Sequence, residues 1–160
     1  SEWAWVEHAH LGGLPPAVDL GAERTLGDVL VGAAHEGLVS AAHDVSDGGL
    51  AQTLAEACLR YGVGARVRLD EVCARDGVSP FVALFAESTA RAVVAVPADR
   101  EARFVDLCAA QGYPLARIGT VDDAAWPDGG QGLTVEGLFT LSLEELAAAH
   151  TGTLPAVFGA

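Results

Sequence analysis

The segment richest in residue types that can do chemistry is residues 43–50, His-Asp-Val-Ser-Asp-Gly-Gly-Leu. Its two adjacent glycines, Gly48 and Gly49, can adopt positive φ angles and allow another group to approach the backbone closely. A helix that begins directly after them presents unpaired N–H groups, and such groups favour anions. The segment therefore indicates a strand-turn-helix unit that could face the phosphates of a nucleotide.

Two carboxylates in this segment modify that interpretation. Asp44 and Asp47 would repel a bare phosphate, but they could hold one through Mg²⁺, which binds carboxylate and phosphate oxygens together. Alternatively, Ser46 or Asp47 only caps the helix, a role worth about 1 kcal/mol that needs no ligand. Spacing alone favours the cap. The candidate cofactor-binding residues are Asp44, Ser46, Asp47, Gly48 and Gly49, with Asp44 and Asp47 as candidate metal ligands.

A second polar cluster, Glu87-Ser88-Thr89-Ala90-Arg91, separates two apolar segments. Its carboxylate, hydroxyls and guanidinium could contact a phosphorylated ligand, since Arg binds phosphate in a forked geometry. The alternative is a solvated turn with a local ion pair between Glu87 and Arg91. From the residues alone, the solvated turn is the favoured interpretation.

Local motifs provide no catalytic centre. All nine basic residues are Arg, so a mechanism that needs a lysine of this chain is excluded. Cys58, Cys73 and Cys108 are too widely spaced for a metal finger and are expected to be reduced, inert thiols. No Ser-His-Asp or Cys-His arrangement and no phosphate-binding Gly-Lys loop can be assembled. We therefore predict no catalytic residue.

Composition limits the organisation and the partners. With 160 residues, 51% of them hydrophobic, the chain can form one core, so we expect a single domain over residues 1–160. The net charge of −13 disfavours nucleic acid and anionic membranes as partners. The longest apolar stretches fall short of the roughly 20 residues of a membrane span. A cytoplasmic location follows, and the absence of Met together with a start at Ser1 indicates a piece of something longer.

Hydrophobic periodicity and turn residues predict alternating helices and strands after an irregular lead-in over residues 1–18. A capping box at Ser142 and Glu145 marks the start of the last helix. The pattern predicts an α/β fold in which helices cover a mixed sheet. Helices are expected at 19–37, 50–58, 80–86, 98–111 and 143–150, and strands at 38–45, 62–69, 92–96, 115–121 and 133–141.

Residues 40–51, Ser-Ala-Ala-His-Asp-Val-Ser-Asp-Gly-Gly-Leu-Ala, resemble a signature in the second half of phosphoribosylformylglycinamidine synthases. Related signatures occur across the aminoimidazole ribonucleotide synthetase superfamily, but further stretches narrow the resemblance to the synthases. They follow in the family's order along nearly the whole chain, at residues 1–4, 10–16, 84–94, 118–121 and 153–159.

The resemblance implies a three-layer α/β/α fold, partly ferredoxin-like, at the C-terminus of an ATP-dependent amidoligase. The full-length enzyme would use ATP and Mg²⁺ to convert formylglycinamide ribonucleotide into formylglycinamidine ribonucleotide, with catalytic residues upstream of this segment. Its implied partners are the upstream domains, a glutaminase subunit and a small accessory subunit. Residues 44–49 would face a second, auxiliary nucleotide site.

At one position the sequence departs from the family pattern, and this limits which binding roles of the family can be assigned to this chain. Thr89 stands where family members have Gln, so an amide that could bind a ligand is missing, and substrate binding is not assigned to Glu87 or Ser88. Two alternatives stay open at this point. The chain could be a structural docking module that touches no nucleotide, or a domain of another ATP-using member of the superfamily.

Overall fold

The computed structural model describes residues 1–122 and 131–159, and the chain separates into two compact units. Unit 1 comprises Ser1–Thr53 and Ser79–Arg117, and unit 2 comprises Leu54–Val78 and Ile118–Ala160. Both units are therefore assembled from segments distant in the sequence. The prediction of one domain over residues 1–160 stays a prediction.

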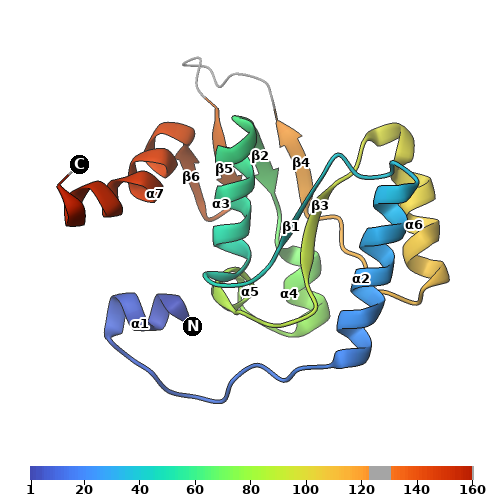
Figure 1. Cartoon of the computed structure of the whole chain (residues 1–160), viewed down its shortest axis with the longest axis horizontal. Coiled ribbons are helices and arrows are strands. Elements are labelled where there is room, and N and C mark those ends of the chain that lie inside the picture. Colours follow the sequence, from blue (N-terminus) through green and yellow to red (C-terminus); the bar gives the residue numbers. More distant parts are fainter. Residues whose placement is uncertain (123–130, 160) are drawn as a thin grey trace. The chain divides into compact units, whose positions relative to one another are not determined.

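Unit 1 combines helices with a small antiparallel ribbon (Figure 1). Strand β1 pairs with β3 so that Asp44 lies opposite Ala92. Helix α3 starts in this unit and continues into the second. The elements are α1 (Glu2–His8), α2 (Leu20–His35), β1 (Ala41–Asp44), α3 (Gly49–Tyr61), α5 (Pro80–Phe85), β3 (Ala92–Ala95), the 3-10 turn Ala98–Arg100 and α6 (Glu101–Ala110).

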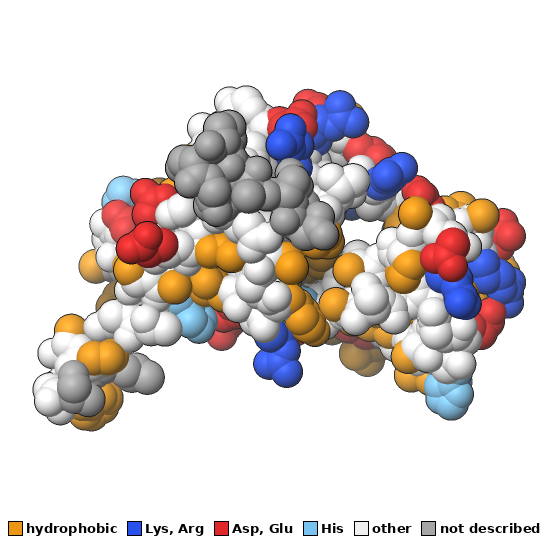
Figure 2. Space-filling view, turned by 90° about the horizontal axis from the view of Figure 1, so that it is seen from above, with side chains coloured by type: hydrophobic (Ala, Val, Ile, Leu, Met, Phe, Trp, Pro, Cys, Tyr) orange, Lys and Arg blue, Asp and Glu red, His pale blue; other side chains and the backbone are white. Residues whose placement is uncertain are grey.

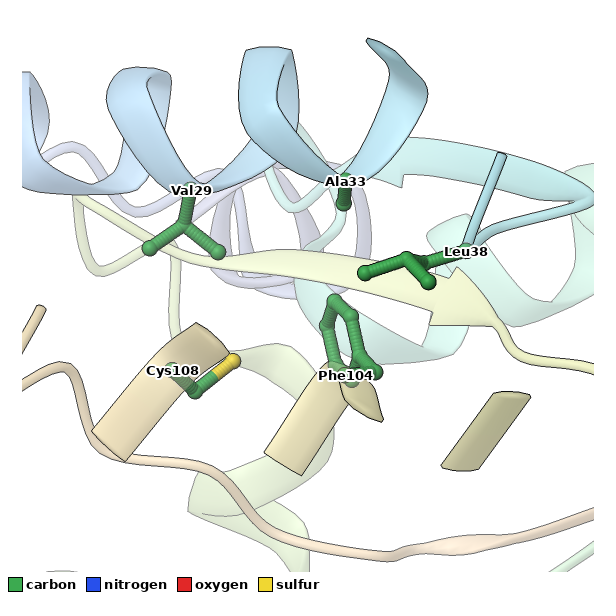
Figure 3. Close-up of a cluster of buried hydrophobic side chains, with 5 residues drawn as sticks. All are labelled: Val29, Ala33, Leu38, Phe104 and Cys108. Atoms are coloured by element: carbon green, nitrogen blue, oxygen red, sulfur yellow. The ribbon is translucent and has the colours of Figure 1, made fainter. Parts of the chain in front are cut away.

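The core of unit 1 lies between α2 and α6 (Figure 3). Val29 and Ala33 are spaced by one helical turn on α2 and face Phe104 and Cys108, which are spaced likewise on α6. Leu38 completes the cluster, and all five side chains are buried. Burial raises the pKa of the Cys108 thiol, which agrees with the inert thiol expected there.

Unit 2 contains a four-stranded sheet in the order β4-β2-β5-β6. Strands β2 and β5 are parallel and the other neighbours are antiparallel, which confirms the mixed sheet and the α/β class. The buried hydrophobic side chains of the central strands are those of Val67, Leu133 and Val135. The elements are β2 (Gly64–Val67), α4 (Asp70–Asp76), β4 (Gly119–Asp122), β5 (Gly132–Val135), β6 (Phe139–Ser142) and α7 (Leu143–Phe158).

The predicted single strand over residues 133–141 is wrong, because the structure has a hairpin there. Strands β5 and β6 pair antiparallel, with Val135 opposite Phe139. Gly137 makes the turn with a φ of 75°, a conformation that glycine adopts without steric cost. Apolar residues continue through the turn at Leu138 and Phe139, so the hydrophobic pattern alone did not reveal the break.

Two further differences concern the ends of the chain. Residues 2–8 of the expected irregular lead-in form α1, in which the Ser1 hydroxyl accepts the Ala4 N–H and Trp3 packs on α5. Helix α7 continues past its predicted end at residue 150 to Phe158. Its start is as predicted, because both bonds of the capping box are present.

Two further differences concern β4 and α4. Strand β4 begins at Gly119 and not at residue 115. A Cβ at Gly119 would lie 2.0 Å from the carbonyl oxygen of Arg66, so the strand pairing requires glycine there. Helix α4 was not predicted, and Gly77 ends it in the left-handed conformation.

Acidic and basic side chains are interspersed on the surface. On the face drawn in Figure 2, several Arg side chains lie beside Asp or Glu side chains. Arg103 makes a two-pronged contact with Glu36, at 2.8 and 2.9 Å. Within residues 1–122 and 131–159, no helix has both the length and the apolar composition needed to cross a membrane.

Candidate functional site

The turn predicted to carry the site connects β1 to α3, and we call it the 44–49 loop. It begins at Asp44, the last residue of β1, and ends at Gly49, the first residue of α3. Gly48 and Gly49 have φ angles of 77° and 65°, as the paired glycines led us to expect. The buried Thr53 hydroxyl donates to the carbonyl oxygens of Asp44, at 2.8 Å, and Gly49, at 3.1 Å. Thr53 therefore ties the two ends of the loop together.

The loop lies directly against the C-terminal end of α5. A Cβ at Gly49 would lie 2.6 Å from the carbonyl oxygen of Leu84 and 2.9 Å from that of Ala86. Real Cβ atoms do not approach backbone oxygens this closely. Glycine at position 49 therefore permits both the close approach of the two backbone segments and the positive φ angle.

The backbone N–H groups of both glycines already have acceptors inside the protein. Gly49 donates to the Ser46 carbonyl oxygen at 2.9 Å. Gly48 donates to Glu87 Oε1 at 3.1 Å, and the same oxygen accepts the Glu2 N–H at 2.7 Å. A phosphate that used the Gly48 amide would have to displace the Glu87 carboxylate.

The carboxylate of Asp44 is held in its charged form. A hydrogen bond from the Ser46 side chain is the main cause of its lowered pKa, followed by a backbone hydrogen bond and the charge of His43, while slight burial opposes them. His43 Nδ1 lies 3.3 Å from Asp44 Oδ1. The Asp44 side chain is 75% exposed, so a soluble cation can reach it.

The fit of a magnesium ion depends on what completes its coordination. Asp44 and Asp47 are exposed and offer the oxygen ligands that Mg²⁺ prefers. In the described part of the chain, no group of three or more His, Cys, Asp or Glu side chains could hold a metal. A Mg²⁺ at Asp44 and Asp47 would therefore need its remaining ligands from outside these side chains, such as phosphate oxygens and water.

The second polar cluster is anchored by contacts from several segments of unit 1. The Thr89 hydroxyl donates to the Ala17 carbonyl oxygen at 3.0 Å, and the Ala90 N–H donates to Glu23 Oε1 at 2.7 Å. Arg91 donates to the Ser88 hydroxyl at 2.8 Å. These bonds fix the backbone of residues 88–91, directly after Glu87, whose carboxylate contacts the 44–49 loop.

Sequence reasoning located the loop but missed the role of Glu87. It considered Glu87 for a ligand or for an ion pair with Arg91, whereas the structure directs the carboxylate to the amides of Gly48 and Glu2. No local spacing rule connects residues that lie so far apart in the chain. Glu87 also lines a hollow of about 600 Å³ together with residues of α1 and of the segment that follows it.

Comparison with known proteins identifies relatives for nearly the whole chain. Residues 2–126 match the family described as AIR synthase related protein, C-terminal domain. Phosphoribosylformylglycinamidine synthase subunit PurL of Frankia casuarinae is 55% identical over 159 residues, 99% of this chain and 19% of that protein. The subunit of the same name from Renibacterium salmoninarum is 54% identical, again over 99% of this chain and 20% of its own length. The chain thus spans about a fifth of the curated relatives it matches.

Solved structures agree with the fold. Thermotoga maritima PurL complexed with FGAR has a TM-score of 0.72 at 22% identity and covers 91% of this chain, which spans 25% of that protein. The same protein complexed with ATP has a TM-score of 0.67 at 22% identity and covers 84% of this chain and 23% of its own. At this identity the likeness establishes the fold, and the sequence relatives confirm the resemblance to phosphoribosylformylglycinamidine synthases. Because the family match extends over more than half of its residues, the chain belongs to the AIR synthase related proteins and represents their C-terminal domain.

Proposed function

We propose that the chain is the C-terminal domain of the synthetase subunit of a phosphoribosylformylglycinamidine synthase, a cytoplasmic enzyme of purine biosynthesis. The observation that carries this proposal is the 55% identity to a subunit of that name, continuous over 159 residues. The whole enzyme would convert formylglycinamide ribonucleotide, ATP and glutamine-derived ammonia into formylglycinamidine ribonucleotide, ADP and phosphate. Because no catalytic residue is assigned to this chain, we expect it to have no ATP turnover alone.

Within that enzyme, the 44–49 loop would face a Mg²⁺-nucleotide at an auxiliary site. The ionised, exposed carboxylate of Asp44 supports this role, and Asp47 would supply a second oxygen ligand. A Mg²⁺ bound there would offset the charge repulsion between these carboxylates and the nucleotide phosphates. Ser46 would keep Asp44 ionised and oriented through its hydrogen bond.

The proposed partners are the upstream domains of the same polypeptide, a glutaminase subunit and a small accessory subunit. Two findings on relatives support them. The curated relatives are about five times longer than this chain. One solved structure with a likeness to this fold is described as PurLQS from Thermotoga maritima.

A second candidate function is a docking module that touches no nucleotide. The occupied amides of Gly48 and Gly49 favour it, because a loop whose donors are satisfied internally can serve as a structural junction. In that case the two exposed carboxylates of Asp44 and Asp47 would be solvated and dispensable.

Binding of Mg²⁺-ADP to the assembled synthase that contains this chain separates the two functions. Replacing both Asp44 and Asp47 by Asn should weaken binding about tenfold or more, because an amide cannot replace a charged metal ligand at equal strength. Asp99→Asn is the matched control, since Asp99 and Asp44 have the same 75% side-chain exposure. Calorimetry that finds unchanged affinity and turnover in the double variant would leave the docking module as the function.

A further inference from the structure

We propose that Glu87 is a positioning residue that couples the docking of α1 to the conformation of the 44–49 loop. One carboxylate oxygen, Oε1, accepts the Glu2 N–H at 2.7 Å and the Gly48 N–H at 3.1 Å. The first donor belongs to the start of α1, and the second precedes the first residue of α3. The coupling deepens the proposed function, and only its consequence for nucleotide binding rests on that function.

Helix α5 provides a second connection between the same two elements. On one side, Trp3 of α1 packs edge-on against Phe81, with ring centroids 4.7 Å apart, and lies 6.2 Å from Phe85. At its end, the backbone of α5 approaches Gly49 so closely that no Cβ would fit. Glu87 lies two residues after the end of this helix, so α1 and the loop contact one short, continuous segment.

A shared acceptor makes the two contacts interdependent. The Glu2 N–H is one of the donors that a helix start leaves without an internal partner, and the Glu87 carboxylate satisfies it with a charge-assisted bond. If α1 detaches, Glu87 loses the Glu2 N–H as a donor. Helix α5, which precedes Glu87, then also loses its aromatic contact with Trp3. The bond to Gly48 should then open more often, so displacement of α1 loosens the loop.

The reverse effect follows from thermodynamic reciprocity. Anything that draws the Gly48 N–H away from Glu87 removes one of the two donors that orient the carboxylate, and so weakens the docking of α1. In the assembled enzyme, the position of α1 would thereby tune how readily the 44–49 loop rearranges around a nucleotide.

The protein contains a matched control for this carboxylate. Glu23 Oε1 accepts the Ala90 N–H at 2.7 Å, so it too binds a backbone amide in the polar segment that follows α5. The structure gives Glu23 no bond to α1 or to the 44–49 loop. Trp5 is a matched control for Trp3, because it lies on the same helix, is 46% exposed and has no ring contact in the described structure.

The test is amide hydrogen exchange of the 160-residue chain by NMR, without nucleotide, so that its result is independent of nucleotide binding. Trp3→Ala removes contacts to α5 but none to the loop, and it should accelerate exchange of the Gly48 amide about tenfold. Glu87→Ala should do the same and also shift the Trp3 indole resonance. Glu87→Gln, which keeps an acceptor, should restore part of the protection.

The controls decide between coupling and general destabilisation. Glu23→Ala and Trp5→Ala should leave Gly48 exchange within about twofold of the unmodified chain. Circular dichroism identifies any variant that fails to fold, and the milder Glu87→Gln keeps the test valid in that case. The proposal is overturned if Trp3→Ala frees α1, judged by its own amides, while Gly48 exchange stays unchanged.

Discussion

Gly49 combines a positive φ angle with a close approach of another backbone segment. Its φ angle is 65°, and a Cβ would meet the carbonyl oxygens of Leu84 and Ala86. Gly77 has almost the same φ angle, 64°, but nothing within 4 Å of its would-be Cβ. The two glycines therefore separate the cost of a left-handed conformation from the cost of a backbone clash.

Gly49→Ala should destabilise the protein more than Gly77→Ala. The left-handed conformation alone costs about 1 to 2 kcal/mol for alanine, and this is the loss we expect at Gly77. At Gly49 the displaced α5 backbone should raise the loss to about 3 kcal/mol or more. Urea denaturation of the two variants measures the difference, and equal losses would show that the loop and α5 are not in tight contact.

Asp44 gives a pH dependence whose sign follows from its pKa. The fold lowers this pKa below 3.8, so the charged form is favoured in the folded state. The stabilisation is fully present above pH 3.8 and is lost as the pH falls through the lowered pKa. The effect should be small, because solvent screens a side chain that is 75% exposed.

Asp44→Asn should consequently be slightly less stable than the unmodified protein near neutral pH. The gap between the two should close on acidification, since the protonated Asp44 also loses its favourable charge interactions. Urea denaturation at a series of pH values provides the measurement. A gap that widens on acidification would contradict the assigned role of Ser46 and His43.

Helix α7 is the element whose start is specified most locally. The Ser142 hydroxyl accepts the Glu145 N–H at 3.1 Å, and the Glu145 carboxylate accepts the Ser142 N–H at 2.8 Å. The Ser142 hydroxyl also donates to the Glu145 carboxylate, at 2.7 Å, and the two bonds that this carboxylate accepts from Ser142 lower the pKa of Glu145. Val157 and Phe158 near the other end are exposed, so tertiary packing contributes little there.

Ser142→Ala should cost about 1 kcal/mol of stability, the usual value of a helix N-cap. Ser142→Asp should retain most of it, because Asp also caps helices well. Thermal denaturation followed by circular dichroism compares the two. A Ser142→Asp variant as unstable as Ser142→Ala would mean that the hydroxyl acts through something other than capping.

Sequence reasoning succeeded where an element is specified by residues close together in the sequence, and it failed where contacts between distant residues are needed. Helix α2 was predicted from its hydrophobic periodicity, and the structure shows that its start is also fixed locally, because Asp19 Oδ1 accepts the N–H groups of Gly21 and Ala22. Helix α1 was missed because contacts from Trp3 to the distant α5 hold it. The same distinction applies to the site, where the paired glycines revealed the loop and only the folded chain brings Glu87 to it.

At the scale of the whole molecule, the chain is acidic, which disfavours nucleic acid as a partner. Its net charge is −13, and the Arg side chains drawn in Figure 2 are interspersed with carboxylates. Several large apolar side chains are nevertheless exposed, including Leu11, Leu14 and Leu20 at 79%, 97% and 78%. Such exposure is expected of a domain that works within a larger assembly, and the chain spans only about a fifth of its curated relatives.

The most direct test of the proposed function is to exchange the segment of the Frankia casuarinae subunit that matches this chain, at 55% identity, for this chain. The chimera is assayed for ATP-dependent formation of formylglycinamidine ribonucleotide, with a chimera carrying Gly49→Ala as the control for a disrupted loop. We expect turnover within about tenfold of the parent enzyme, a loss of no more than about 1.4 kcal/mol in transition-state stabilisation. A chimera that folds and assembles like the parent yet forms no product would contradict the assignment.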